Sequence, residues 1–249
     1  MLLTGAVLPR QVDAGRAAAA QRPCDICRFQ ELNFCGALRR DDSRDRIGGI
    51  HRAIAARHNI YRAGEPNPGV AVVCDGWAVR FLQLPNGRRQ ILSVVMPGDL
   101  ISAGAAFAEQ FAFSVQAVTS LRYCIFPAAD VRARLHDDPA LLDVWMALAA
   151  DEHRDADRRL VDVGQRPALE RIASLIFQIM LRVEERGELA GDEFAFPMSQ
   201  QQMADCTGLT PVHTCRVLSA LRKNGVCDVG HGAIKVLDRA ELQRIATIK

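Results

Sequence analysis

The chain lacks any long uncharged apolar run, and the stretch from Met1 to Leu8 is too short for the apolar core of a signal peptide. We therefore expect no membrane segment and a cytoplasmic protein. The chain also lacks a marked excess of charge, because its net charge is only +2. Nucleic-acid binding therefore has to be argued from a motif and not from bulk charge.

The sequence also lacks the features that usually accompany an enzyme. It has no nucleotide-binding fingerprint, no catalytic triad, no constellation of Asp and His residues and no internal repeat. We therefore do not expect an enzyme. Its 249 residues suit two domains with a connecting element, and the 49% hydrophobic content allows real cores.

What the sequence does have is an uneven distribution of eight cysteines. Cys24, Cys27 and Cys35 follow the spacing C-x2-C-x7-C, and Cys124 comes 89 residues later. In a reducing compartment such cysteines are more often metal ligands, redox-active thiols or core residues than disulfides. Four thiolates can enclose one metal centre, as in iron–sulfur clusters. Four-cysteine zinc sites usually repeat C-x2-C, and Cys124 has no such partner.

The sequence leaves other interpretations of the cysteines open. Those near the N-terminus could be incidental thiols beside a mobile arm, which we expect over residues 1–22. Cys124 could be a small strand residue packed in a core. Apolar neighbours indicate core positions for three other cysteines, Cys74, Cys206 and Cys227.

Within the first half of the chain, the spacing of apolar residues changes from that of a helix to that of short strands. Apolar residues between Ile47 and Ala55 recur at helical spacing and predict a helix over residues 44–59. Short β-type runs with Gly and Pro turn signals follow over residues 60–127, including the hairpin dipeptide Asn86-Gly87. They predict a compact antiparallel barrel or jelly roll.

Apolar residues at helical spacing predict a second helix over residues 139–163 with an apolar stripe, and we consider a seam in which this helix pairs with a second copy of itself. Asp151, Glu152 and Asp155 lie in or beside the stripe, so like charges near the seam would oppose dimerisation. We assign the following residues to the dimer face: Leu141, Trp145, Leu148, Glu152, Asp155 and Ala156. A shorter helix is expected over residues 168–185.

Residues 165–249 contain the segment MSQQQMADCTGLTPVHTCRVLSALRKNGV. Ser199 can cap one short helix, Gly208 supplies a left-handed turn, and Thr210 and Pro211 begin a second helix. This pattern is typical of a helix-turn-helix. The runs VCDV and AIKVL that follow predict a two-stranded wing.

A helix-turn-helix places the start of its second helix in the major groove of DNA. Arg216 is the best candidate to read a base, because its guanidinium can donate two parallel hydrogen bonds to guanine. The other base-reading candidates are Val212, His213 and Cys215. The phosphate-contact candidates are Ser199, Thr210, Thr214, Arg222 and Lys223. A symmetric dimer would bind an inverted repeat, whereas an ordinary helical hairpin would bind no DNA.

With these motifs together, the chain resembles the FNR-type oxygen regulators of the CRP/FNR superfamily. The resemblance runs from Cys24 to Leu237 and includes the cysteine spacing, GRRQI, PGD, a segment closing in IFP, the long helix and the winged helix-turn-helix. The x7 gap is similar to that of the alphaproteobacterial branch. The resemblance implies an α+β chain with a cyclic-nucleotide-binding-like β-roll sensor domain (residues 23–135), a dimerisation helix (136–164) and a winged helix-turn-helix domain (165–249).

The resemblance also implies a cofactor and partners. A 4Fe-4S cluster held by Cys24, Cys27, Cys35 and Cys124 would favour the dimer, and oxygen would dismantle it. The partners implied are double-stranded DNA, a second copy of the chain and RNA polymerase.

The chain departs from the family in two places. Val212 and Cys215 replace the usual Glu and Ser of the recognition helix. Phe113-Ser114-Val115 stands where a phosphate-binding Arg-Ser pair is expected, so we expect no cyclic-AMP binding. A haem-type relative that uses Cys74 is disfavoured, because no His lies near it in the sequence. The alternative functions are a regulator of this fold that senses a small molecule, with cysteines that are incidental or bind zinc, and an electron carrier.

Overall fold

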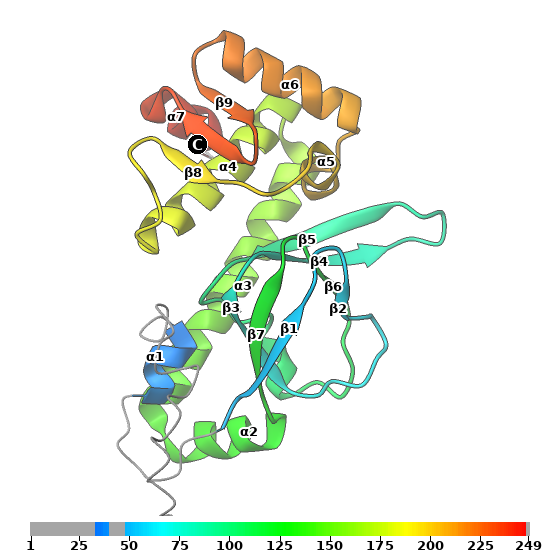
Figure 1. The fold of residues 1–249 in the computed structure, drawn as a ribbon, viewed down its shortest axis with the longest axis vertical. Helices are drawn as coiled ribbons and strands as arrows, with labels where there is room; N and C mark the ends of the chain where they lie inside the picture. Colours follow the sequence, from blue (N-terminus) through cyan, green and yellow to red (C-terminus); the bar gives the residue numbers. More distant parts are fainter. Residues whose placement is uncertain (1–32, 40–47, 248–249) are drawn as a thin grey trace, which may run out of the picture.

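The structure is a computed structural model that describes residues 33–39 and 48–247. These residues form an α+β molecule with a β-roll, a long helix and a smaller C-terminal domain above the roll (Figure 1). The arm expected over residues 1–22 lies outside the described residues. No helix among the described residues is long and apolar enough to cross a membrane.

The roll contains two antiparallel sheets, with strand orders β1-β7-β3 and β2-β6-β4-β5. The Asn86-Gly87 hairpin joins β4 to β5 as predicted, and Gly87 adopts the positive φ of 82° that this turn requires. The strands are β1 (Ile50–Ile54), β2 (Asn59–Tyr61), β3 (Val70–Asp75), β4 (Ala78–Gln83), β5 (Arg89–Val95), β6 (Ser114–Ala117) and β7 (Leu121–Phe126).

The helix predicted over residues 44–59 is wrong within the described residues. Residues 50–54 form the edge strand β1, which pairs with β7, and Arg57 adopts a positive φ of 69° that ends any regular helix. The spacing of the apolar residues predicted a helix wrongly because β1 is largely exposed, so these residues do not mark one buried face. Pairing with β7, and not burial of one face, decides its conformation.

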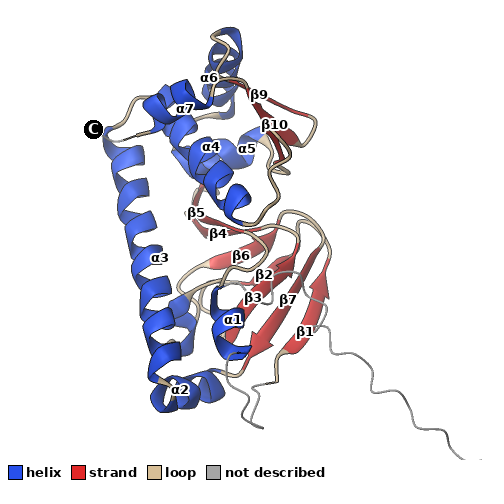
Figure 2. Ribbon diagram, turned by 90° about the vertical axis from the view of Figure 1, so that its left-hand side faces the viewer, coloured by secondary structure: helices blue, strands red, loops and turns tan. Residues whose placement is uncertain are grey.

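The helices of the N-terminal half surround the roll: α1 (Asn33–Arg39), the 3-10 helix η2 (Ala103–Ala106), α2 (Ala128–Asp137) and α3 (Pro139–Gln165). Asp138 caps α3 through the amide of Leu141, and Pro139 occupies its first turn. Helix α3 runs alongside the roll up to the C-terminal domain, and α1 lies between α3 and the strands (Figure 2).

The C-terminal domain confirms the predicted helix-turn-helix and wing. Its elements are α4 (Ala168–Glu185), β8 (Glu193–Ala195), α5 (Gln200–Thr207), α6 (Pro211–Lys223), β9 (Cys227–Gly230), β10 (Ala233–Val236) and α7 (Arg239–Ala246). The wing gains a third strand, β8, which the sequence did not predict and which pairs with β10.

Two hydrophobic cores organise the described residues. One fills the roll and includes Phe34 of α1 and Trp145 of α3. The other belongs to the C-terminal domain and continues into the β4–β5 hairpin, where the Trp77 ring meets Phe196 edge-on at 6.2 Å. The roll and the C-terminal domain are therefore joined by apolar packing as well as by the long helix.

Candidate functional site

Cys124 lies on the central strand of the β1-β7-β3 sheet and is 2% exposed. His51 of β1 is directly opposite it in the antiparallel register, and the His51 Nδ1 atom is 3.2 Å from the Cys124 Sγ atom. Opposite residues of paired strands project from the same face of a sheet. The sheet register therefore brings an imidazole to a thiol 73 residues away in the chain.

Cys74 completes a group of three ligand-type side chains. The pairing of β3 with β7 shifts register between Val73 and Asp75, which places Cys74 at an irregularity of the strand. Such bulges redirect a side chain. One ligand atom each from His51, Cys74 and Cys124 lies within 4.8 Å of the other two.

The predicted ligand Cys35 lies on α1, which packs onto the same core as Cys124. The neighbouring Phe34 ring meets Phe126 edge-on at 5.7 Å and Trp145 edge-on at 5.2 Å. Two of the four predicted cluster ligands thus belong to one core region, where soft, half-buried or buried thiols fit an iron–sulfur group. The other two, Cys24 and Cys27, lie outside the described residues.

The remaining cysteines divide as follows. Burial raises the pKa of the Cys206 thiol to about 12 and that of Cys227 to about 11, which keeps both protonated at neutral pH. Their predicted core role is confirmed. Cys74 is half-buried and packs against the core of the roll, and it also lies beside His51 and Cys124. No local sequence signal marks His51 or Cys74, because only the sheet register and the bulge bring them to Cys124.

The helix-turn-helix is fixed by its caps. Ser199 and Gln202 form a capping box at the start of α5, and Gly208 ends this helix with a φ of 67°. Thr210 then caps α6 through the amide of His213, and Pro211 follows in its first turn. Each of these local predictions is confirmed.

The surface of α6 carries most of the predicted DNA-contact residues. Val212, His213, Cys215 and Arg216 are exposed on its first two turns, and Lys223 is exposed at its end. Arg222 is also exposed, with its Nε atom 3.4 Å from Asp228 of the wing.

The prediction that Thr214 contacts phosphate is wrong. Thr214 is fully buried, because it lies on the face of α6 that packs into the C-terminal domain.

Several residues assigned to the dimer face turn inward instead. Leu141 and Trp145 are buried in the core of the roll, and Glu152 accepts hydrogen bonds from the Ser102 hydroxyl and the Ala103 amide and pairs with Arg80. Asp155 faces the C-terminal domain through Arg158, which also donates to Gln178 of α4. The assignment of Leu141, Trp145 and Glu152 to the dimer face is wrong because these side chains pack on or bind to the roll. The Asp155 side chain is 48% exposed, so its place on the dimer face stays a prediction.

The exposed side of α3 carries its own apolar stripe. Leu142, Met146 (59% exposed) and Leu160 (74% exposed) are large apolar side chains that face solvent in the protomer. The stripe consists of Leu142, Met146, the partly buried Ala149, Ala156 and Leu160, and the polar His153 interrupts it. Its alternating spacing of four and three residues is that of a coiled-coil seam, so this face suits a second helix.

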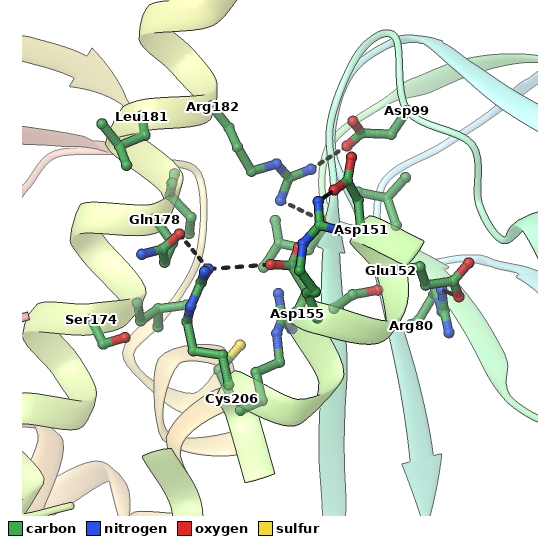
Figure 3. Close-up of a pocket in the computed structure, with 18 of the residues that line it drawn as sticks. Arg80, Asp99, Asp151, Glu152, Asp155, Ser174, Gln178, Leu181, Arg182 and Cys206 are labelled. Atoms are coloured by element: carbon green, nitrogen blue, oxygen red, sulfur yellow. Dashed lines mark hydrogen bonds and ion pairs between the residues drawn. The ribbon is translucent and has the colours of Figure 1, made fainter. Parts of the chain in front are cut away.

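A cavity of about 470 Å³ lies between the roll, α3 and α4 (Figure 3). Many charged side chains line it, together with apolar ones. Asp99 of the roll accepts hydrogen bonds from Arg182 of α4 and, at 2.5 Å, from Arg186, the residue that caps the end of α4. Burial lowers the pKa of Arg159, which donates to the Leu92 carbonyl. These ion pairs hold the C-terminal domain onto the roll.

The comparisons with known proteins agree with this architecture. Residues 51–138 match the cyclic nucleotide-binding domain family, and residues 170–245 match the Crp-like helix-turn-helix domain family. The chain is 31% identical over 226 residues to the nitrogen fixation regulation protein FixK of Bradyrhizobium diazoefficiens, which covers 90% of this chain and 93% of that protein. It is 25% identical over 231 residues to the transcriptional activator protein anr of Pseudomonas aeruginosa, covering 92% and 94%.

The solved structure of FixK2 from Bradyrhizobium japonicum has the same fold. It superimposes with a TM-score of 0.73 at 24% identity and covers 81% of this chain and 99% of that one. The β-roll, the long helix and the winged helix-turn-helix thus recur in the same order. Because both domain families match and the similarity to FixK extends over nearly the whole chain, the chain belongs to the CRP/FNR family of transcription regulators.

Proposed function

We propose that this protein is an oxygen- or redox-responsive transcription regulator whose DNA binding depends on an iron–sulfur cluster held by Cys24, Cys27, Cys35 and Cys124. The observation that carries the proposal is the packing of Cys35 and Cys124 into one core region although they are far apart in sequence. When bound, a 4Fe-4S cluster would supply a redox- and oxygen-sensitive link between these thiolates.

The position of α1 suggests how such a link would reach the dimer face. Phe34, next to Cys35, packs on Trp145 of α3, and Met146 follows on the exposed stripe of the same helix. Holding Cys35 against the roll would keep α1 docked on this part of α3. A fixed α3 would then present its stripe to the partner copy at less conformational cost.

The dimer would read DNA through α6. With the two recognition helices in successive major grooves, the target is an inverted repeat with half-sites about one helical turn apart. Arg216 would read a guanine, with His213, Val212 and Cys215 beside it. Ser199 and Thr210 at the helix starts, together with Arg222 and Lys223, would contact phosphates. We infer activation through RNA polymerase in the cytoplasm from the relative named as a transcriptional activator.

Cyclic AMP is not the expected signal. The Arg80 guanidinium, which points from the roll toward α3, stacks 4.1 Å from the centre of the Phe113 ring and pairs with Glu152. Phe113 also stands where the family pattern has a phosphate-binding arginine. The positive charge of Arg80, which a phosphate would need as its partner, is therefore already paired.

A second candidate function rests on the charged cavity between the roll, α3 and α4. Its volume lies within the range of about 300–1,000 Å³ that small-molecule sites occupy. A polar ligand there would contact both the roll and the DNA-binding domain and could set their relative position. In that case the cysteines would be incidental to signalling.

An absorption spectrum of anaerobically purified protein, recorded with a DNA-binding assay on the same sample, tests the proposal. We expect a broad band near the boundary of the visible and ultraviolet that bleaches in air, with DNA binding lost in parallel. A colourless protein whose binding is indifferent to air would favour the second candidate.

A further inference from the structure

We propose that His51, Cys74 and Cys124 form a mononuclear Zn²⁺ site, separate from the cluster ligand set but sharing Cys124 with it. The three ligand atoms lie within 4.8 Å of one another. In a tetrahedral zinc site, Zn–S bonds of about 2.3 Å and Zn–N bonds of about 2.0 Å place neighbouring ligand atoms roughly 3.5–3.8 Å apart. The distances from Cys124 Sγ to His51 Nδ1 and Nε2, 3.2 and 3.5 Å, are close to this spacing.

The chemistry of the three side chains matches the ion. Two thiolates and one imidazole are soft or borderline ligands, which Zn²⁺ prefers to the harder carboxylates. Two thiolates at this separation would repel each other unless a cation lay between them, and Cys124 is buried where a lone thiolate is costly. Zn²⁺ would displace the two thiol protons to solvent and bind the neutral imidazole.

The backbone also leaves room for the Cys124 thiol. Gly49 lies so close that an added Cβ would be 3.3 Å from Cys124 Sγ and 3.0 Å from the Phe126 ring. A side chain at Gly49, which directly precedes β1, would therefore crowd the sulfur and the Phe126 ring. Three protein ligands leave one tetrahedral position open, as in zinc sites that also bind water or another ligand.

Sharing Cys124 has a regulatory consequence, which rests on the proposed function. One sulfur cannot serve both sets fully, so Zn²⁺ bound by His51 and Cys74 would withhold Cys124 from an iron–sulfur cluster. Zinc would then hold the regulator in its cluster-free form. The zinc site itself requires no cluster and is tested separately.

The test is an anaerobic titration of cluster-free protein with Co²⁺, whose spectrum reports thiolate ligation, followed by competition with Zn²⁺. We expect one tight site in the wild-type protein. His51→Ala and Cys74→Ser should each weaken it at least about 100-fold, because losing a ligand costs more than the 10–100-fold loss of an outer-shell partner. His58→Ala, a change at an exposed histidine outside the group, should leave it unchanged.

A triple variant, Cys24→Ser, Cys27→Ser and Cys35→Ser, separates this site from the cluster ligands. We expect it to bind Co²⁺ as the wild type does, while His51→Ala still assembles an air-sensitive cluster. Wild-type affinity in both His51→Ala and Cys74→Ser, or loss of the ion in the triple variant, would overturn the proposal. So would a wild-type protein that binds no Co²⁺, which would leave His51 and Cys124 as a hydrogen-bonded pair only.

Discussion

The two working ends of the molecule are built in opposite ways. At the DNA-reading end, α5 and α6 are neighbours in the chain, and each is capped by its own residues, Ser199 and Thr210. At the cysteine end, His51, Cys74 and Cys124 come from β1, β3 and β7 and meet only through tertiary packing, and Cys35 of α1 packs against the same core. The helix boundaries of the first end are set by local caps, although both helices pack into the C-terminal core. The grouping of side chains at the second end depends on strand pairing within the roll. A change in the state of the cysteines would therefore alter contacts between several elements of the roll.

The strongest test of this contrast is Cys124→Ala. It should abolish the air-sensitive iron complement and cluster-dependent DNA binding together, because it removes the ligand on the central strand. Iron and sulfide analysis with anaerobic DNA binding measures both. Cys74→Ala is the matched control at the same end and should keep the cluster. A full, air-sensitive iron complement in Cys124→Ala would refute the ligand assignment.

Next in expected size is Leu160→Glu on the exposed stripe of α3. A charge at a desolvated seam should prevent dimerisation, and DNA binding should fall with it. Sedimentation velocity of the anaerobic protein reports the dimer fraction. Leu84→Glu, at an exposed leucine of the β4–β5 turn, is the matched control. Equal dimer fractions in the two variants would mean that the copies pair through another surface.

The junction between the ends can be weakened at Asp99. Asp99→Ala removes the carboxylate that Arg182 and Arg186 share, and the Arg186 side chain is only 5% exposed. Because the pair is partly solvated, we expect a loss of about 2 kcal/mol in the free energy of unfolding, below the 3–5 kcal/mol of a fully buried pair. Urea denaturation measures it. Glu184→Ala, which removes an exposed ion pair with Arg239, should change the free energy of unfolding little. Comparable losses in the two variants would show that the Asp99 ion pairs stabilise the fold no more than an exposed pair does.

At the DNA end, Arg216→Ala should cost roughly 1–3 kcal/mol in binding and relax the preference at one guanine in each half-site. Lys223→Ala should instead weaken all sequences alike and lower the salt dependence by about one unit. Binding to a panel of half-site variants distinguishes the two. If Arg216→Ala weakened every sequence equally, base reading would have to be reassigned to His213 or its neighbours.

The smallest expected effect is that of Thr214→Val. Among the described residues the buried Thr214 hydroxyl has no hydrogen-bond partner, so replacing it with a methyl group should raise the free energy of unfolding by about 1 kcal/mol. Thermal unfolding and DNA affinity, measured side by side, check this. A drop in affinity like that of Lys223→Ala would instead restore Thr214 as a phosphate contact.

The sequence-based predictions succeed at the DNA-reading end, where the signals are local, and fail more often at the cysteine end, where tertiary packing decides. The caps and turn of the helix-turn-helix were predictable because each signal acts within a few residues, as at Ser199 and Gly208. The inward direction of Trp145 and Glu152 was not, since both lie on a stripe compatible with either the roll or a second helix. The approach of His51 to Cys124 left no trace in the sequence, because a register of paired strands is a property of the folded sheet.

The two tryptophans lie at two junctions of the molecule, so each can serve as an intrinsic fluorescence probe of its own junction. Trp145 is buried against Phe34, where α1 meets the long helix, and Trp77 meets Phe196 where the roll meets the DNA-binding domain. With one of them replaced by Phe, the fluorescence of the other would follow a single junction. Trp145 emission would report release of α1, and Trp77 emission would report movement of the DNA-binding domain. Comparing the two time courses after exposure to air would show which end of the protein moves first.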